Sequence, residues 1–413
     1  MKSQPLLIRD IGEFLTLQGV IKKDGRKITE SDLGIIKNAA LLLDGNNIIW
    51  WGEQKKIPKT LSKIKKLKEF SAKKQTLLPG FVECHTHSLF AGSRAQEFEL
   101  RNQGVSYQEI ANRGGGILST MKKTREESLK KLTETGKQRV KRFIEQGVTT
   151  LEIKSGYALN LKDEIKLLQA AKSINSIRIV PTFLGAHALP PEFKSHSDYL
   201  QYLSTSILPV IKKKKLSNRV DIFIEKGFFE NPFAANYLNQ AKNLGFDITI
   251  HADQLSLSGG TQTAIDLCAS SADHVIQINE ELIKKISASN TTAVLLPAAD
   301  LYMKCKYPPA RQLIDNGARV ALATDFNPGS SPTQDLSLVG LLARLEMKMT
   351  LPEVIASYTY NAWKSLYPHC DIKNGFWSAD FISTGLCWTD LFYSVGQKMS
   401  DEIIFSGNIM DVD

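Results

Sequence analysis

The sequence predicts an α/β fold: a TIM-type (β/α)8 barrel, accompanied by a small β-sandwich domain built from the N- and C-terminal segments. Two observations predict the barrel. From residue 77 onward, short runs rich in β-branched residues alternate with longer segments of helical periodicity. In addition, five of the seven histidines lie at or just beyond the carboxyl ends of apolar runs. That end of an α/β barrel is where its functional side chains gather.

The length of the chain fits one barrel with a smaller satellite domain. Its 413 residues exceed a typical single domain, and a hydrophobic content of 42% is enough to bury a large core. We expect residues 1–76 to form the N-terminal part of the small β domain and residues 77–365 to form the barrel. Residues 366–413 are then expected to return to the β domain.

The expected elements follow from the alternation of apolar patterns. Strands are expected at residues 78–84, 149–153, 177–183, 220–224, 246–250, 273–278, 292–296 and 319–323. Helices are expected at residues 106–112, 124–146, 162–174, 197–214, 232–243, 260–268, 279–288, 309–316 and 351–366. Residues 35–53 contain two apolar runs around an Asp-Gly-Asn-Asn turn, which predicts a β-hairpin. Strand-and-turn segments from Ser378 and Asp401 are expected to complete the small domain.

Composition argues against a secreted or membrane protein. No apolar stretch reaches the roughly 20 residues of a membrane span, and no apolar signal core follows the N-terminal Met-Lys-Ser-Gln-Pro. The five cysteines are scattered without paired metal-ligand spacing, which is untypical of a disulfide framework. We therefore expect a cytoplasmic protein with reduced thiols and no membrane partner.

The net charge of +9 comes largely from lysine runs at residues 55–59, 63–68 and 212–215. No aromatic residues interleave with these lysines and no recognition motif accompanies them, so the runs indicate solvated surface rather than a nucleic-acid interface. A positive field would still favour encounter with a small anionic substrate.

His85 and His87 predict a metal site. Side chains two residues apart on a strand point to the same side, so both imidazoles can bind one ion. The same spacing also arises by chance on solvated strands. However, His251 and Asp325 follow the fifth and eighth expected strands and should reach the same mouth. Three imidazoles and one carboxylate suit one Zn²⁺ or Fe³⁺ per subunit, with a position left open for water.

Such a site predicts hydrolysis. A metal lowers the pKa of its bound water from about 15.7 to roughly 7 and makes hydroxide available at neutral pH. Asp325 could bind the metal and also accept the proton of the attacking water, although an aspartate in this position could equally cap a turn. His274 would face the same mouth, either as a further ligand or as a hydrogen-bond donor to a polarised carbonyl. The donor role is favoured because the metal already has four ligands; a core histidine bonded to backbone is the alternative.

Several segments together resemble a known family. They are Pro79-Gly-Phe-Val-Glu-Cys-His-Thr-His, Glu97-Phe-Glu-Leu-Arg-Asn-Gln-Gly, Gly114-Gly-Gly-Ile-Leu-Ser-Thr-Met, Glu152-Ile-Lys-Ser-Gly-Tyr157, Phe183-Leu-Gly-Ala-His187-Ala, His251-Ala-Asp-Gln254, Ser271-Ala-Asp-His274 and Ala323-Thr-Asp-Phe-Asn-Pro-Gly-Ser-Ser-Pro332. With them, residues 10 to 370 or so resemble the imidazolonepropionase family of the amidohydrolase superfamily. His-x-His identifies only the superfamily, whereas the triple glycine, the Lys-Ser-Gly-Tyr and the Asp-Phe-Asn-Pro-Gly-Ser-Ser segments are specific to the family.

The resemblance implies a reaction and a set of roles. The reaction is hydrolysis of the cyclic amide of 4-imidazolone-5-propanoate to N-formimidoyl-L-glutamate in histidine degradation. Metal-bound hydroxide would attack the ring carbonyl, His274 would help to stabilise the oxyanion, and Asp325 would pass the proton to the leaving nitrogen. Substrate would be bound by Arg94, Tyr157, His187, Gln254 and Ser330, and product by Asn327 and Gly329. A guanidinium suits the propanoate because it binds carboxylates in bidentate fashion.

Some of these residues have simpler explanations. Arg94 could be a surface arginine, Tyr157 a packed aromatic and Gly329 a turn glycine. Gln254 stands where some relatives have glutamate, and an amide cannot act as a base. The glycines at 114–116 lack the Lys-Ser/Thr of a phosphate loop, so we expect a tight loop with backbone N–H groups toward the anionic substrate.

Two rival functions remain open at this point. One is a different cyclic amidohydrolase or deaminase of the same superfamily, for which a two-metal site at the fourth strand would offer Glu225 and Lys226. The other is a non-catalytic barrel that acts as a binding protein through its lysine runs. The presence of all four metal ligands favours an enzyme over the second rival. A homodimer is a possible assembly.

Overall fold

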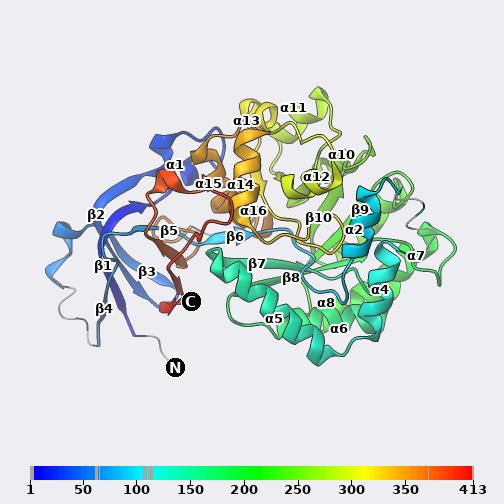
Figure 1. The fold of residues 1–413 in the computed structure, drawn as a ribbon, viewed down its shortest axis with the longest axis horizontal. Helices are drawn as coiled ribbons and strands as arrows, with labels where there is room; N and C mark the ends of the chain where they lie inside the picture. The colour runs from blue at the N-terminus through cyan, green and yellow to red at the C-terminus, as the bar shows by residue number, and fades with distance from the viewer. Residues whose placement is uncertain are drawn as a thin grey trace.

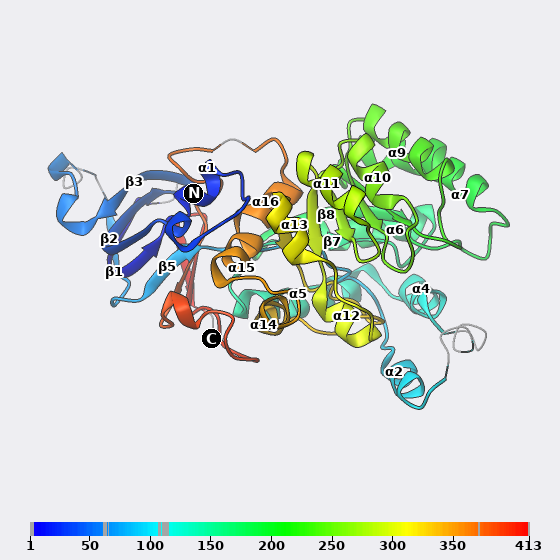
Figure 2. The same cartoon turned by 90° about the horizontal axis from the view of Figure 1, so that it is seen from above.

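The computed structural model describes residues 4–60, 64, 66–105, 109, 115–370 and 372–411 of the chain. It has two parts, a barrel and a smaller sheet (Figures 1 and 2). The blue N-terminal strands and the red C-terminal segment lie together at one end of the molecule in both views. In the described part of the chain, no helix is long and apolar enough to cross a membrane.

Eight parallel strands form the predicted barrel. They are β6 (Phe81–Glu83), β7 (Val148–Lys154), β8 (Arg178–Ala186), β9 (Arg219–Ile224), β10 (Asp247–Ala252), β11 (Ser271–His274), β12 (Thr292–Leu295) and β13 (Val320–Leu322), paired in chain order from β6 to β13. Beyond the ends of β13 and β6, an isolated bridge between Thr86 and Phe326 joins the first and last strands. There the N–H of His87 donates to the carbonyl oxygen of Phe326 at 2.9 Å. The seam of the barrel therefore runs directly beside the His-x-His pair.

Helices cover the outside of the barrel. Those before β10 are α2 (Ala95–Asn102), α4 (Ile117–Glu126), α5 (Leu129–Glu145), α6 (Leu161–Lys172), α7 (His196–Tyr202), α8 (Leu208–Lys213) and α9 (Phe233–Asn243). Those after it are α10 (Gly260–Asp266), α11 (Glu280–Ala288), α12 (Pro297–Met303), α13 (Ala310–Asn316), α14 (Leu336–Leu345), α15 (Leu351–Tyr358) and α16 (Tyr360–Leu366). In α5, Leu132, Val140 and Phe143 are buried on one face, as an amphipathic helix requires. Ser128 caps this helix by accepting from the N–H of Lys131 at 3.1 Å.

The first expected strand, residues 78–84, is two strands that belong to different sheets. β5 (Thr76–Pro79) pairs with β1 and β14 in the small domain, and β6 belongs to the barrel. Gly80 lies between them, and a Cβ at this position would lie 2.3 Å from side-chain atoms of Thr149. The chain can cross between the sheets because glycine lets its backbone approach β7 closely. The domain boundaries at 76/77 and 365/366 stay predictions.

Several helices differ from expectation. Most of the helix expected at residues 106–112 falls outside the described residues. Helices α2, α12 and α14 were not expected, and the helix expected at 197–214 contains a π-helical stretch, Leu203–Ile207. The helix expected at 351–366 breaks at Thr359, whose φ of −119° and ψ of −100° are not helical. α12 and α14 are short and largely buried, so they lack the clear polar face on which periodicity depends, whereas α2 buries none of its residues and lacks an apolar face.

The small domain is completed by the C-terminal return, as predicted. Its strands are β1 (Leu6–Leu15), β2 (Ile35–Asp44), β3 (Asn47–Glu53), β4 (Lys68–Ser71), β5, β14 (Phe381–Thr384), β15 (Glu402–Phe405) and β16 (Asn408–Asp411). They form one mixed sheet in the order β16-β15-β14-β5-β1-β2-β3, from which β4 branches at β1. Leu6 and Ile8 pack in one apolar cluster and Leu7 in another, so both faces of the sheet are covered. The predicted hairpin is β2 and β3.

Candidate active site at the barrel mouth

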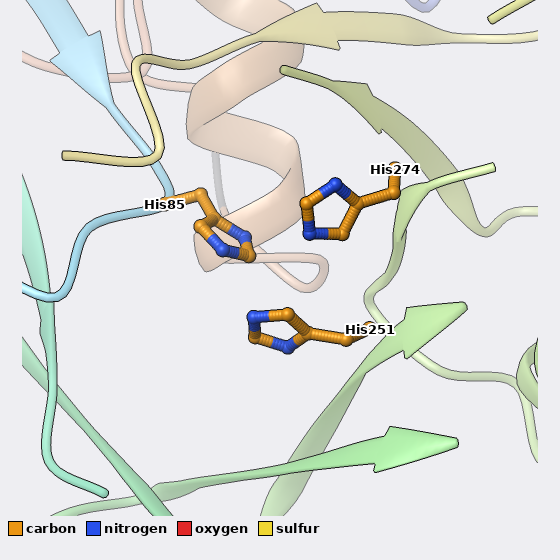
Figure 3. A group of neighbouring side chains, drawn as sticks. All are labelled: His85, His251 and His274. Atoms are coloured by element: carbon orange, nitrogen blue, oxygen red, sulfur yellow. The ribbon is translucent and has the colours of Figure 1, made fainter. Parts of the chain in front are cut away.

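Three histidine rings converge at the carboxyl ends of the strands (Figure 3). His251 lies on β10, His274 is the last residue of β11, and His85 follows β6 by two residues. The ring centroid of His85 lies 4.5 Å from that of His251 and 5.7 Å from that of His274. Each of these histidines has at least one ring nitrogen positioned to share one metal ion, because the nitrogens lie within 4.8 Å of one another.

A second candidate metal group contains His85, His87 and Asp325. The Nε2 atoms of both histidines lie 3.4 Å from Oδ1 of Asp325. His251 joins this group, since its Nε2 lies 3.4 Å from Nε2 of His87. Nε2 of His85 and Oδ1 of Asp325 are buried and have no hydrogen-bond partner. Buried polar atoms without partners are costly, and a cation bound between them would satisfy both.

The backbone at two of these positions is left-handed. Asp325 has a φ of 53° and His274 a φ of 75°. Such values are uncommon for residues other than glycine, and they persist only where the surrounding structure holds them. Both residues sit where a strand ends and the chain turns, so the turn directs their side chains toward the mouth. The side chain of Asp325 therefore lies at the mouth, near His85 and His87.

Carboxylates support two of the histidines from below the mouth. Oδ2 of Asp273 lies 2.6 Å from Nδ1 of His85. Oδ2 of Asp221 lies 3.0 Å from Nδ1 of His251. The hydrogen bond to Asp273 fixes the tautomer of His85, because a histidine that donates through Nδ1 presents its Nε2 lone pair to a metal. The contact of Asp221 with His251 is an ion-pair contact. Sequence reasoning missed both carboxylates, although alternation along the expected strands could have indicated that Asp221 and Asp273 point inward.

Burial and neighbouring charges set the protonation states at the mouth. Burial opposes ionisation of Asp325, but the close polar contacts and the charges of His85 and His87 hold its pKa well below the ordinary value. Burial lowers the pKa of His274 to about 3 and that of His187 to about 4. At neutral pH the site therefore contains the ionised carboxylate of Asp325 and the neutral imidazoles of His187 and His274.

His85 is expected to release a proton when metal binds. Burial and Lys154 lower its pKa, but Asp273 and Asp325 outweigh them and raise it to about 9. In the metal-free protein this protonation contributes stability that is fully present below the ordinary pKa and is lost as pH rises through about 9. Metal affinity should accordingly rise with pH up to that value. Calorimetric titration with metal in two buffers of different ionisation enthalpy should give different heats at neutral pH; equal heats would contradict the expectation.

One cavity of about 510 Å³ brings the predicted residues together. Its lining includes all the predicted substrate and product residues, namely Arg94, Tyr157, His187, Gln254, Asn327, Gly329 and Ser330. His87, His251, His274 and Asp325 also line it. The sequence analysis missed an apolar wall formed by Ile117, Phe223, Phe228, Leu255 and Met303, and a second arginine, Arg101. The apolar wall escaped notice because its members come from helices α4 and α12, strand β9 and two loops, which share no local pattern in the chain.

A network at α2 fixes Arg94 at the cavity wall. Nε of Arg94 donates to Oε2 of Glu97 at 2.8 Å, and Glu97 also accepts from the N–H of Gly116 at 3.1 Å. The N–H of Gly116 is therefore engaged by Glu97, which corrects the expectation that it faces the substrate. A Cβ on Gly329 would lie 2.1 Å from Nη1 of Arg94. Gly329 thus leaves the space that the guanidinium occupies, and Arg101 donates to its carbonyl oxygen at 3.0 Å.

The loop after β13 is held by its own polar groups. Oδ1 of Asn327 accepts from the N–H groups of Gly329 and Ser330 at 2.8 and 2.7 Å. Oγ of Ser330 lies 3.4 Å from Oδ2 of Asp325. Asn327 therefore shapes the turn that places Ser330 beside the carboxylate of Asp325.

Glu225 and Lys226 do not approach either candidate metal group. Glu225 accepts from the N–H groups of Leu255 and Ser256 at 2.8 and 3.3 Å, and so holds the loop that carries Gln254. Lys226 is exposed. Within the described part of the chain, the metal groups include neither residue. The residues that the two-metal rival would use thus lie outside both candidate groups.

Comparisons with known proteins identify the family of the chain. Residues 76–367 match the model of the amidohydrolase family. An imidazolonepropionase of Bdellovibrio bacteriovorus is 58% identical over 97% of this chain and 95% of its own length. One of Kosmotoga olearia is 39% identical over 98% of both chains.

Solved structures share the fold at low identity. Guanine deaminase of E. coli covers 98% of this chain and 99% of its own with a TM-score of 0.71 at 15% identity. An adenosine deaminase from Xanthomonas campestris covers 98% and 92% with a TM-score of 0.70 at 13% identity. At such identities the similarity is one of fold alone. The sequence relatives are far closer, and by them the chain belongs to the imidazolonepropionase family of the amidohydrolases.

Proposed function

We propose that the protein hydrolyses 4-imidazolone-5-propanoate to N-formimidoyl-L-glutamate with one metal ion held by His85, His87, His251 and Asp325. The observation that carries the proposal is the cavity that is lined by His87, His251 and Asp325 of this ligand set and by Arg94. The cavity can accommodate the substrate ring beside the proposed metal ligands and the substrate carboxylate beside Arg94. The family to which the chain belongs supports the same substrate.

The donor set of three imidazoles and one carboxylate fits Zn²⁺ and ferric iron. Either ion would supply a water of lowered pKa and polarise the ring carbonyl. The chain's own residues then have to orient the ring, move one proton and bind the propanoate.

Asp325 is the proton carrier in this proposal. Its carboxylate is ionised, so it can accept the proton of the attacking water through Oδ2, beside Ser330. As the new C–O bond forms and the ring C–N bond breaks, the same carboxyl group delivers that proton to the leaving nitrogen. His274 is neutral and can donate a hydrogen bond to the carbonyl oxygen as negative charge develops.

The remaining lining residues orient the ring and the propanoate. The rings of His187 and His87 are stacked at 5.1 Å, and Nδ1 of His187 is bound to the carbonyl oxygen of Gly156 at 3.0 Å. This bond turns Nε2 of His187 away from the backbone. Tyr157 and Gln254 bind substrate in this proposal, Gln254 through hydrogen bonds only, because an amide is not a base. Asn327 and the backbone of Gly329 bind the product.

A substrate assay tests the proposal. Purified protein should consume 4-imidazolone-5-propanoate, followed by the loss of its ultraviolet absorption, and should contain one metal ion per chain by elemental analysis. Inactivity on this substrate together with turnover of guanine or a dihydropyrimidine would transfer the assignment to the rival amidohydrolases. Two stoichiometric metals would contradict the mononuclear site.

The Arg94→Met variant should mainly weaken substrate binding. Removing a bidentate, charge-assisted contact of about 1.5–3 kcal/mol predicts a KM increase of roughly 10- to 100-fold with a nearly unchanged kcat. Steady-state kinetics will measure both constants. Arg344→Met is a matched control, since Arg344 donates to the carbonyl oxygen of Phe392 and does not line the cavity. A large fall in kcat at unchanged KM would contradict the binding role.

A further inference from the structure

Lys154 lies in the centre of the barrel, beneath the metal-binding residues. It is the last residue of β7, and its side chain is 1% exposed. Its Nζ lies 2.8 Å from Oδ2 of Asp221, 2.9 Å from Oε1 of Glu152 and 3.8 Å from Oδ2 of Asp273. The buried ammonium group of Lys154 thus forms ion pairs with three buried carboxylates. Lys154 does not line the substrate cavity.

Each of the three carboxylates leads to a different part of the ligand set. Asp273 holds Nδ1 of His85 at 2.6 Å. Asp221 lies 3.0 Å from Nδ1 of His251. Glu152 accepts through Oε2 from the N–H of Thr86 at 3.0 Å, in the middle of the His-x-His segment. Asp273 and Asp221 therefore connect Lys154 to His85 and His251. Glu152 connects it, through the N–H of Thr86, to the segment that contains His87.

The carboxylates need a common cation to occupy these places. Oδ2 of Asp221 and Oδ2 of Asp273 both lie within 3.8 Å of the same Nζ. Ionised carboxylates this close repel one another in a buried site unless a cation lies between them. Without the ammonium group of Lys154 they would move apart and would no longer hold the histidines beside them with Nε2 turned to the metal.

We propose that Lys154 is a positioning residue for the metal centre: by holding Glu152, Asp221 and Asp273 in place, it orients His85, His87 and His251 for metal binding. The inference rests on the proposed function only in that the site binds a metal. Lys154 would thus control metal affinity although its side chain contacts neither metal nor substrate.

The test is the metal affinity of the Lys154→Met variant. Metal-free protein would be titrated with Co²⁺ against a chelator of known affinity, and the visible absorption of bound Co²⁺ would be recorded. We expect affinity to fall by roughly 10- to 100-fold, as for other residues that orient metal ligands, and the Co²⁺ spectrum to change. If the ammonium acted only as a nearby positive charge, its removal would relieve repulsion and tighten binding; tighter or unchanged binding overturns the proposal.

Two further variants keep the result interpretable. Lys166→Met is the matched control, since its ammonium binds the carbonyl oxygens of Arg125 and Glu127 outside the site; wild-type Co²⁺ affinity is expected. If Lys154→Met does not fold, Asp221→Asn tests the same chain of contacts through His251, and unchanged affinity there overturns the proposal. Failure of the wild-type protein to bind Co²⁺ would instead refute the metal site of the proposed function.

Discussion

The Asp325→Asn variant is expected to lose turnover while keeping its fold. Asparagine has nearly the same size, but it cannot accept the proton of water or deliver one to the leaving nitrogen. The loss of a general acid–base group predicts a fall in kcat of about 10²- to 10⁴-fold. The fall would be larger if the amide also weakens metal binding. Single-turnover kinetics at saturating metal, with the metal content measured on the same sample, separate the two contributions.

Asp300→Asn is the matched control for this variant. Asp300 is also a buried carboxyl group, on α12, but it is absent from the cavity lining. Burial, reinforced by the charge of Asp325, raises its pKa to about 8, so it is largely neutral already at neutral pH. Replacing it by a neutral amide should leave kcat close to wild type. A near-normal kcat for Asp325→Asn would refute its role as the proton carrier.

Removing the metal with a chelator should abolish activity and lower the free energy of unfolding. Without metal, Nε2 of His85 and Oδ1 of Asp325 are buried and have no hydrogen-bond partner. Close to them, Lys154 forms ion pairs with three carboxylates. An ion that binds only the folded protein stabilises it by about 2.7 kcal/mol at a hundredfold excess over Kd. Thermal unfolding with and without chelator measures this difference, and added Zn²⁺ or iron should restore both stability and activity.

The His251→Ala variant shows whether the stabilisation comes from this site. Without one ligand the protein should show little change in unfolding temperature on addition of metal. His196→Ala is the control, since the ring of His196 packs against Phe229 outside the substrate cavity and should leave the metal response intact. An equal response in His251→Ala would mean that the ion binds elsewhere.

The sequence by itself determined the barrel, the C-terminal return and the places of the four proposed metal ligands. The reason is local: period-two runs and helical periodicity mark the elements, and the end of a parallel strand must face the mouth of the barrel. His85, His87, His251 and Asp325 follow such runs directly. The residues expected to bind substrate were identified by resemblance, and all of them line the cavity.

Only the tertiary structure decided how these residues are supported. The split at Gly80 depends on a close approach to Thr149, 69 positions later in the printed sequence. The network around Lys154 joins β7, β9 and β11, and the contact between Glu97 and Gly116 joins α2 to the residue before α4. Such contacts are set by the closure of the barrel, which brings together side chains with no shared local pattern. Strand ends can therefore be located from periodicity, whereas the charges that orient the ligands depend on which strands become neighbours across the barrel interior.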